Sequence, residues 1–388
     1  MACALIAQGG GPTAVMNVTL IAAIRQAREA RHTFSRFLGS IHGLKGILED
    51  RFIDLFSQDE ALLDRLADAP GAALGSSRVK LTPEEIHRLL EAFRRYDVRC
   101  FFYNGGNGSM GTAFDIESKA HAIGYELQVI GIPKTVDNDI VETDHTPGYG
   151  SAARFWAHAT RDMGLDHRAL PSPILICEVM GRNVGWVVAA TAFARHYEDD
   201  APHLIYCPER PLPRAKLLSD IEAVYRRFGR AFVCIGEGQL DENGEAFGAD
   251  VDRPESPRHR LASNLAHAVA KFVGEELKLR VRSERPSLLG RCSSAYVSEV
   301  DKRSAELCGR EAVRAALSGE TGKMVALGRE PGNCTSYTKL VPLRDVAGKE
   351  RPLPAEFLSE RGNDVTAAFL KYAQPLIGEV RPFPRLRE

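Results

Sequence analysis

The chain has 388 residues, with 50 basic and 51 acidic side chains, and this length favours two domains over one. The balanced charge gives no general attraction to nucleic acid or to an anionic membrane, so any affinity for phosphate must be local. No apolar run approaches the ~20 residues that span a bilayer, and the N-terminus lacks the basic region of a signal peptide.

The eight cysteines are scattered along the chain, and none forms a C-x-x-C pair, which argues against zinc or redox chemistry. Four of them lie in apolar runs that are typical of strands, where a free thiol packs as a small hydrophobic group: Cys3, Cys177, Cys207 and Cys234. This usage favours a reducing compartment, and we expect a cytoplasmic protein.

The first motif is a glycine turn between a strand and a helix. The strand is expected at 3–8, the turn G-G-G-P-T at 9–13 and the helix at 14–30. This arrangement offers backbone N–H groups and a helix N-terminus to a phosphate, although a tight connection without a ligand is an equal alternative. The small-residue loop at 72–80 ends in two cations, of which Arg78 could grip a phosphate or lie on a solvated surface.

A second glycine loop, N-G-G-N-G-S at 104–109, follows a strand expected at 98–103 and precedes a helix that ends near Gly124. A polyphosphate fits better here, because the polar side chains of this loop could also reach a metal ion. The helix before it, at 83–96, begins with Thr82 as N-cap and Pro83 in its first turn.

A third loop, P-K-T-V-D-N-D at 133–139, follows an apolar strand at 127–132. Pro133 ends the strand, and the loop then carries one cation, one hydroxyl and two carboxylates. These groups suit proton abstraction from a hydroxyl beside a bound phosphate. A solvated acidic turn is the alternative for this segment taken alone.

The rest of the chain continues to alternate strands with helices. We expect strands at 173–179, 203–207, 231–236 and 323–327, and helices at 152–163, 213–228, 257–277 and 301–318, with the turn 180–186 leading into another helix that ends near Arg195. The pattern predicts a doubly wound α/β fold with mainly parallel sheets, in two units that change somewhere near 140–170. The C-terminal fifty residues are interpreted as a packing tail with little chemistry.

Three motifs together carry a resemblance to a known family: P-K-T-V-D-N-D at 133–139, M-G-R at 180–182 and G-G-N-G-S at 105–109. In this order and spacing they resemble the phosphofructokinase family, from Gly9 to about Ser318. The sequences Y-N-G-G-N at 103–107 and G-S-S-R-V-K at 75–80 are most similar to the bacterial pyrophosphate-using branch of the family. The resemblance implies two Rossmann-like domains: a phosphoryl-donor domain at 1–165 plus about 285–330, and a sugar-phosphate domain at 166–284 plus about 331–388.

The resemblance also implies an activity, the Mg²⁺-dependent transfer of a phosphoryl group to the 1-hydroxyl of fructose 6-phosphate by a homodimer or homotetramer. The catalytic residues would be Asp137 as base, Asp139 beside it and near the metal, and Lys134 and Arg182, which offset charge. The substrate would be bound by Thr135, Met180, Gly181, Glu237 and an arginine pair on the sugar phosphate, Arg282 and Arg291. The donor would be bound by Gly10, Gly11, Arg78, Gly106, Asn107, Gly108 and Ser109, with Asn107 also facing Mg²⁺.

Two positions disagree about the phosphoryl donor. Lys134 resembles the pyrophosphate enzymes, whereas Gly108 stands where those enzymes usually have an aspartate that excludes a nucleotide. We favour pyrophosphate, with ATP as the alternative. Pro173 replaces an arginine that reaches a neighbouring subunit in many members, and Arg168 or His167 could substitute for it. The sequence 288–290 lacks the family's usual polar residues, which could admit another sugar phosphate such as sedoheptulose 7-phosphate.

Two other classes of function compete with this prediction. A non-catalytic subunit that binds sugar phosphate is disfavoured, because the candidate base and phosphate ligands are all present. An NAD-dependent dehydrogenase is disfavoured, because the first turn lacks the G-x-G-x-x-G fingerprint and the ribose-binding acid about 20 residues beyond it.

Overall fold

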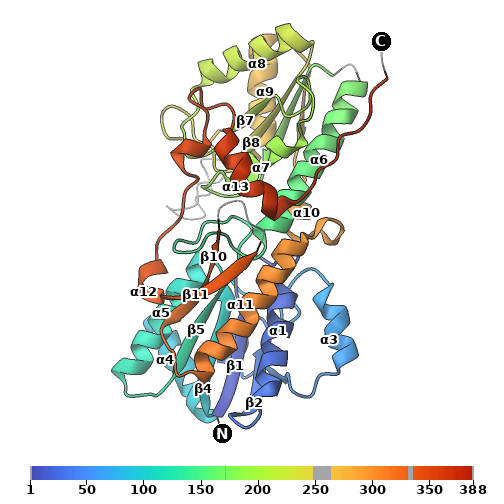
Figure 1. Ribbon diagram of the computed structural model, residues 1–388. Helices are drawn as coiled ribbons and strands as arrows, with labels where there is room; N and C mark the ends of the chain where they lie inside the picture. Colours follow the sequence, from blue (N-terminus) through green and yellow to red (C-terminus); the bar gives the residue numbers. More distant parts are fainter. Residues whose placement is uncertain (1, 171, 248–263, 331–334, 387–388) are drawn as a thin grey trace. The chain divides into compact units, whose positions relative to one another are not determined.

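The structure is a computed structural model that describes residues 2–170, 172–247, 264–330 and 335–386. The chain forms two compact units, Met1–Ser151 with Arg291–Arg351, and Ala152–Gly290 with Pro352–Glu388. Each unit is built around its own sheet (Figure 1). The predicted α/β fold with two Rossmann-like domains is thus confirmed. The compact units change at residues 151, 290 and 351, and the predicted boundaries at 165, 285 and 330, with the roles given to the two domains, stay predictions.

The first unit contains a seven-stranded sheet of order β11-β10-β5-β4-β1-β2-β3. Its strands are β1 (Ala2–Gln8), β2 (Phe34–Ser40), β3 (Phe52–Asp54), β4 (Val98–Gly105), β5 (Gln128–Pro133), β10 (Lys323–Arg329) and β11 (Ser336–Pro342). Pairing is parallel except at the two outer pairs, β2 with β3 and β10 with β11. Strands 1, 2, 4 and 5 therefore all end at one edge of the sheet.

Both faces of this sheet are buried under helices. Leu5 in β1 faces one core and Ile6 the other, as the period of two along a strand requires. Because both faces are covered, the central strands are mostly apolar and do not alternate apolar with polar residues. One face packs against α2 (Leu44–Leu48), α4 (Pro83–Arg95), α5 (Asn107–Ala122) and α12 (Leu343–Val346), and the other against α1 (Met16–Glu29), α3 (Glu60–Ala67) and α11 (Glu299–Leu317).

The second unit contains a parallel four-stranded sheet of order β7-β8-β6-β9. Its strands are β6 (Ile174–Val179), β7 (Leu204–Tyr206), β8 (Ala231–Gly236) and β9 (Val281–Glu284). One face packs against α8 (Arg214–Phe228) and α9 (Leu265–Leu277). Among the described residues of both units, the remaining helical segments are α6 (Tyr149–Ala169), α7 (Trp186–Ala190), α10 (Leu289–Cys292), α13 (Ala367–Ile377), and 3-10 helices at Thr191–Ala194, Ser294–Tyr296 and Ala355–Phe357.

Several of these elements differ from the sequence-based expectation. The C-terminal fifty residues contain most of strand β11 and all of helix α13, which the sequence analysis did not expect. Strand β9 was not expected from the sequence. It lies at a sheet edge, and its charged side chains are partly exposed. The helix expected at 257–277 is seen from Leu265, and its predicted first turns lie outside the described residues. No helix in the described ranges is long and apolar enough to cross a membrane.

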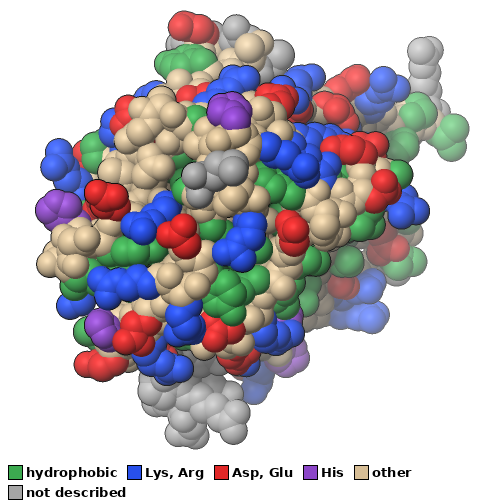
Figure 2. Space-filling view, turned by 90° about the horizontal axis from the view of Figure 1, so that it is seen from below, with side chains coloured by type: hydrophobic (Ala, Val, Ile, Leu, Met, Phe, Trp, Pro, Cys, Tyr) green, Lys and Arg blue, Asp and Glu red, His purple; other side chains and the backbone are tan. Residues whose placement is uncertain are grey.

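The surface and the thiols agree with the composition. Figure 2 shows acidic and basic side chains interspersed over the face in view, as the near-equal totals of 50 and 51 suggest. Among the described cysteines all seven are free, and six are buried. Burial raises the pKa of the Cys3 thiol to about 11, so it stays protonated at neutral pH.

Gly309 in α11 and Gly111 in α5 form a matched pair that tests the helix packing. A Cβ atom on Gly309 would collide with the carbonyl oxygen of Thr19 in α1, whereas one on Gly111 would meet nothing within 4 Å. We expect Gly309→Ala to destabilise the fold by about 1–3 kcal/mol, as overpacking does. Gly111→Ala should instead stabilise it by about 0.5–1 kcal/mol, the gain in helix propensity. Urea unfolding measures both, and a stabilising Gly309→Ala would contradict the packing described.

Candidate active site

The three loops singled out in the sequence meet at one edge of the first sheet. The N–H of Gly9 donates to the carbonyl oxygen of Asn104 at 2.8 Å, and the N–H of Lys134 donates to that of Gly105 at 3.0 Å. Strand order reverses between β1 and β4, because β2 lies on the other side of β1. Ligands of open α/β sheets bind at such a reversal, beyond the carboxyl ends of the strands.

The loop 72–80 is fastened to the same edge by side chains of β1 and α1. Gln8 accepts a hydrogen bond from the N–H of Leu74 at 3.1 Å, and Asn17 accepts one from that of Ala73 at 2.7 Å. The N–H of Gly10 donates to the Ser77 carbonyl oxygen at 3.0 Å. The predicted donor ligand Arg78 is exposed at the end of this loop. The loop 72–80, which carries Arg78, therefore lies beside the first glycine turn.

Lys134 joins the third loop to the first glycine turn. Its side chain is 2% exposed, and Nζ donates to the carbonyl oxygen of Gly11 at 2.6 Å. Gly10 has a left-handed backbone with φ of 75°, and a Cβ atom there would lie 3.3 Å from Nζ of Lys134. Position 10 thus requires glycine for two reasons: the left-handed backbone and the close approach of the Lys134 ammonium group.

The second glycine loop supplies a helix N-terminus to the same edge. Gly106 is the N-cap of α5, and the first turn of the helix carries no acidic side chain, so its positive end is not neutralised there. A Cβ atom on Gly108 would meet nothing within 4 Å, and the space beside it is open. Ser109 is buried instead, with its hydroxyl against Gly9. Burial raises the pKa of Tyr103 to about 12, and a hydrogen bond between the hydroxyls of Tyr103 and Ser109 opposes this rise.

The loop that carries the candidate base has a fixed backbone. Asp137 is half-buried, and its N–H donates to the hydroxyl of Thr135 at 3.1 Å. Asn138, fully buried, has a left-handed φ of 58°, and its side-chain oxygen accepts a hydrogen bond from the N–H of Thr146 at 3.0 Å. The left-handed backbone of Asn138, stabilised by the hydrogen bond of its side chain to Thr146, therefore determines how the neighbouring Asp137 is oriented.

Asn107 and Asp139 lie together and have oxygens suited to a hard cation. The amide nitrogen of Asn107 donates to the Asp139 carboxylate at 2.8 Å and to its carbonyl oxygen at 3.0 Å. The amide oxygen of Asn107 is buried and accepts no hydrogen bond from the residues described. Across those ranges, no three His, Cys, Asp or Glu side chains are grouped as metal ligands. Such a pair fits Mg²⁺, which is commonly held by one or two protein oxygens with water and substrate phosphates.

The M-G-R motif of the second unit forms a turn between β6 and α7. Gly181 and Arg182 both have positive φ, 144° and 52°. Their N–H groups donate to one carboxylate oxygen of Glu237, at 3.2 and 2.8 Å. Glu237 therefore shapes this turn, and its predicted contact with sugar hydroxyls stays a prediction. Met180, which precedes the turn, is buried.

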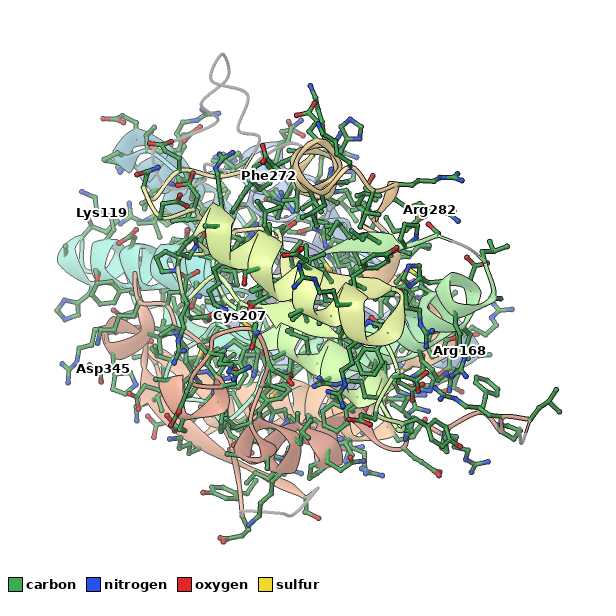
Figure 3. All side chains as sticks on the ribbon, turned by 90° about the horizontal axis from the view of Figure 1, so that it is seen from above. Lys119, Arg168, Cys207, Phe272, Arg282 and Asp345 are labelled. Atoms are coloured by element: carbon green, nitrogen blue, oxygen red, sulfur yellow. The ribbon has the colours of Figure 1, made fainter. Side chains whose placement is uncertain are left out.

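The predicted arginine pair is divided between the two units. Arg282 extends from the edge strand β9 (Figure 3) and lies 3.6 Å from Glu284 and 4.0 Å from Asp166. Arg291 lies in the first unit, where a Cβ atom on Gly11 would be 3.3 Å from its Nε atom. Arg291 is thus beside the first glycine turn, and the sharing of one sugar phosphate by the two guanidiniums stays a prediction.

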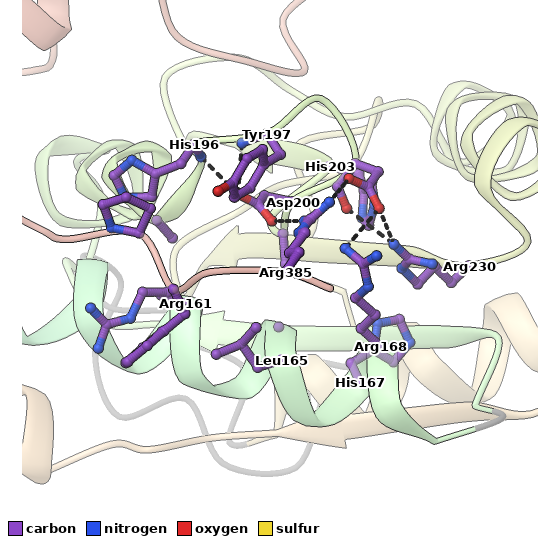
Figure 4. A pocket seen from close by; sticks show the side chains of 16 residues that line it. Arg161, Leu165, His167, Arg168, His196, Tyr197, Asp200, His203, Arg230 and Arg385 are labelled. Carbon is purple, nitrogen blue, oxygen red and sulfur yellow. Dashed lines mark hydrogen bonds and ion pairs between the residues drawn. The ribbon is translucent and has the colours of Figure 1, made fainter. Parts of the chain in front are cut away.

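A separate charged pocket lies in the second unit, where Arg168, Asp200 and Arg385 line it (Figure 4). Asp199 also lines this pocket. Asp199 accepts ion pairs from Arg168 at 3.1 Å, from Arg230 at 2.6 Å and from Arg385. The remaining cavity is about 20 Å³, the space of roughly one water molecule. Arg168 is therefore engaged inside its own unit, and His167 is buried. A contact of either residue with a neighbouring subunit stays a prediction.

Four positioning residues were not found from the sequence: Gln8, Asn17, Asp301 and Arg351. Asp301, which was noted only as a helix start, is fully buried and accepts hydrogen bonds from the N–H groups of Gly148 and Ser151 at 2.8 and 2.9 Å. The only signal for Gln8 and Asn17 was a polar residue within an apolar strand or helix face. Nothing local in the sequence distinguishes Asp301 or Arg351 from a surface charge.

Comparison with known proteins agrees with this architecture. The pattern of the family described as Phosphofructokinase matches residues 3–316. A pyrophosphate–fructose 6-phosphate 1-phosphotransferase of Rhodospirillum rubrum is 38% identical over 97% of this chain and 95% of its own. A sulfofructose kinase of Alkalicoccus urumqiensis is 32% identical over 92% of each chain. The crystal structure of a pyrophosphate-dependent phosphofructokinase from Marinobacter aquaeolei superposes with a TM-score of 0.88 at 32% identity, over 100% of this chain and 94% of that one.

The chain belongs to the phosphofructokinase family, and the prediction of an enzyme of this family is confirmed.

His203 makes the stability of the second unit depend on pH. Burial, followed by the charges of Arg230 and His167, lowers the pKa of His203 from 6.5 to about 4, while Asp199 opposes this shift. The neutral ring accepts a hydrogen bond from the N–H of Phe232 at 2.9 Å. A group whose folded pKa is depressed contributes stability above pH 6.5 and loses it as the pH falls towards 4.

We therefore expect the wild type to lose about 1–2 kcal/mol more stability between pH 7 and pH 5 than His203→Asn, which keeps an acceptor but cannot titrate. Urea unfolding at the two pH values measures this difference. His167 titrates in both proteins, so its lowered pKa cancels in the comparison. Equal losses in the two proteins would contradict the account.

Proposed function

We propose that this protein transfers a phosphoryl group from pyrophosphate to the 1-hydroxyl of fructose 6-phosphate, with Mg²⁺, giving fructose 1,6-bisphosphate and phosphate. The observation that carries the proposal is the buried ammonium of Lys134, fixed between the third loop and the first glycine turn. An ammonium group fixed beside the first glycine turn can offset the charge of a phosphate bound over that turn. The Rhodospirillum and Marinobacter relatives bear names of the same activity.

The donor is proposed to lie over the glycine turns. Gly10 and Gly11 let it approach the backbone beside Lys134, while Gly106 and Asn107 begin a helix whose positive end favours a phosphate. Gly108, the buried Ser109 and the exposed Arg78 complete the proposed set. Two cations and a helix N-terminus around one small anion supply the charge neutralisation that phosphoryl transfer needs.

Asp137 is the proposed general base. The 1-hydroxyl oxygen of the sugar attacks the terminal phosphorus atom of pyrophosphate, the bond from that phosphorus to the bridging oxygen breaks, and phosphate leaves. The hydroxyl proton passes to the carboxylate of Asp137, which is half-buried on a fixed loop. Thr135 and Lys134, on the same loop, are proposed to hold the phosphoryl group in line with the attacking oxygen.

Mg²⁺ is proposed to be held through the amide oxygen of Asn107 and the carboxylate of Asp139. Support comes from the unsatisfied, buried Asn107 oxygen beside that carboxylate. When bound, the ion supplies positive charge to the phosphate oxygens. Thr135 and Lys134 orient the donor, and Asp137 removes the proton.

The sugar phosphate is proposed to be bound by the second unit through Arg182, Met180, Gly181 and Glu237, with Arg282 and Arg291 on the 6-phosphate. Glu237 supports this assignment indirectly, because it holds the N–H groups of the turn that carries Arg182. The identity of the acceptor is the least constrained part, since a sulfofructose kinase is also among the relatives. A cytoplasmic homodimer or homotetramer completes the proposal.

ATP is the second candidate donor, and one observation favours it. The space beside Gly108 is open, so no side chain there would repel the α-phosphate of a nucleotide. Lys134 and Gly108 thus favour different donors. Pyrophosphate is preferred in this proposal because the Rhodospirillum and Marinobacter relatives bear the names of pyrophosphate-using enzymes.

Asp137→Asn tests the proposed base. The amide keeps the size of the side chain but cannot accept the hydroxyl proton, so we expect kcat to fall by about 10²–10⁴-fold with the melting temperature little changed. Steady-state turnover on fructose 6-phosphate with Mg²⁺ gives kcat, and thermal unfolding gives the control. A variant with near-normal kcat would remove Asp137 from the mechanism.

Turnover with pyrophosphate and with ATP at equal concentration tests the donor. We expect pyrophosphate to be preferred in the wild type, and Gly108→Asp to lower any ATP activity by about tenfold or more, because a carboxylate would repel the α-phosphate. Gly111→Asp is the matched control, since it adds the same charge to α5 at another open position. Preference of the wild type for ATP would overturn the proposed donor, and equal effects of the two aspartates would overturn the role of position 108.

A further inference from the structure

Arg351 binds the backbone of the loop that carries Asp137 and Asp139. Its Nε and Nη2 atoms donate to the carbonyl oxygen of Asn138 at 3.1 and 2.8 Å, and Nη1 donates to those of Thr143 and Asp144, both at 2.6 Å. The main-chain N–H of Arg351 donates to the carbonyl oxygen of Asp139 at 2.7 Å. One residue thus gathers four carbonyl oxygens from the two ends of the segment 138–144.

No helix or strand fixes the path of this segment. Residues 138–144 form neither helix nor strand, so their carbonyl oxygens find no partners in a ladder. Several carbonyl oxygens that point to one place repel each other unless a donor of positive charge lies among them. The planar guanidinium, with five N–H groups in a fixed fork, meets both ends of the segment at once.

Other contacts also hold the loop. The side-chain oxygen of Asn138 accepts a hydrogen bond from the N–H of Thr146 at 3.0 Å, and the amide nitrogen of Asn107 donates to the carbonyl oxygen of Asp139 at 3.0 Å. The hydroxyl of Thr146 donates to the Thr135 carbonyl oxygen at 2.9 Å, which closes the loop on the side of β5. The N–H of Asp144 donates to the carbonyl oxygen of Leu327 in β10 at 2.8 Å. Between these two anchors lies Asn138, the residue next to the proposed base, and Arg351 is bonded twice to its carbonyl oxygen.

We propose that Arg351 is a positioning residue for the phosphoryl transfer: its guanidinium fixes the backbone of residues 138–144 and thereby the direction of the Asp137 carboxylate. This inference rests on the proposed function, in which Asp137 is the base. Arg351 itself acts on backbone oxygens, so it changes the alignment of the reacting groups and leaves substrate binding to other residues. A small displacement of a base is enough to lower a rate strongly.

Arg351→Ala is the first test, with Arg344→Ala as the matched control. Arg344 lies on α12 with its side chain 74% exposed, 4.0 Å from Asp345. We expect Arg351→Ala to lower kcat by about 10–100-fold, since misplacing a reacting group by about 1 Å has an effect of this size, while KM for both substrates changes by less than about threefold. Arg344→Ala should leave both constants unchanged.

Adding guanidinium ion at tens of millimolar tests whether kcat of Arg351→Ala recovers. Such recovery is not expected if Arg351 only stabilises the fold. The free ion can occupy the space left in Arg351→Ala and bind the same carbonyl oxygens. We expect it to restore kcat by at least about fivefold in that variant, and to activate neither the wild type nor Arg344→Ala. Should Arg351→Ala fail to fold, Arg351→Lys keeps the charge and loses the fork, so it should fold normally and still lose kcat. A normal kcat in Arg351→Lys and in a folded Arg351→Ala would overturn the proposal.

A double-mutant cycle with Asp137→Asn separates this inference from the proposed function. If Arg351 acts through the base, replacing it in the Asp137→Asn background should change the remaining rate by less than about threefold. Full additivity of the two changes would overturn the positioning role and leave the base intact. Near-normal turnover of Asp137→Asn alone would overturn the base, whatever Arg351→Ala does.

Discussion

The burial of one cation is the constraint on which the candidate site depends. An ammonium group at the position of Lys134 must be surrounded by oxygens, because a charge removed from water is otherwise strongly destabilising. The Gly11 carbonyl oxygen supplies one of them, and it can do so only because the glycine turn brings its backbone within 2.6 Å. The turn, the strand ends and the third loop therefore depend on one another. Displacing any one of them would leave the buried ammonium group of Lys134 without its carbonyl partner.

The same edge of the sheet shows how backbone groups and side chains divide the work. The glycine loops bring main-chain N–H groups and a helix N-terminus close to one another, which favours an anion of almost any kind. The selective groups come from the third loop, where Asp137 and Asp139 stand on a backbone held from outside by Arg351. An arrangement that suits anions in many α/β proteins is thus combined here with two carboxylates on a neighbouring loop.

Much of this was accessible from the sequence, and the reason is physical. Buried parallel strands must be apolar on both faces, and glycine turns at their ends are visible as composition, so β1, β4 and β5 with their loops could be predicted. The motif residues from Lys134 to Asp139 were found in the same way. Arg351 and Asp301 could not be found, because their partners lie more than 140 positions away in the chain and their roles depend on backbone atoms that carry no sequence signal. Strand β9 was missed because edge strands keep polar side chains.

Gly108 has a consequence for how such enzymes diversify. Glycine and aspartate codons can differ by a single base, and the space at this position is open, so either residue fits without repacking. If this position selects the donor, a single mutation is enough to change the phosphoryl donor of a lineage from pyrophosphate to ATP, or the reverse. Such an exchange would leave the fold, the base and the buried lysine untouched, so phosphofructokinases with different donors could arise repeatedly from one scaffold.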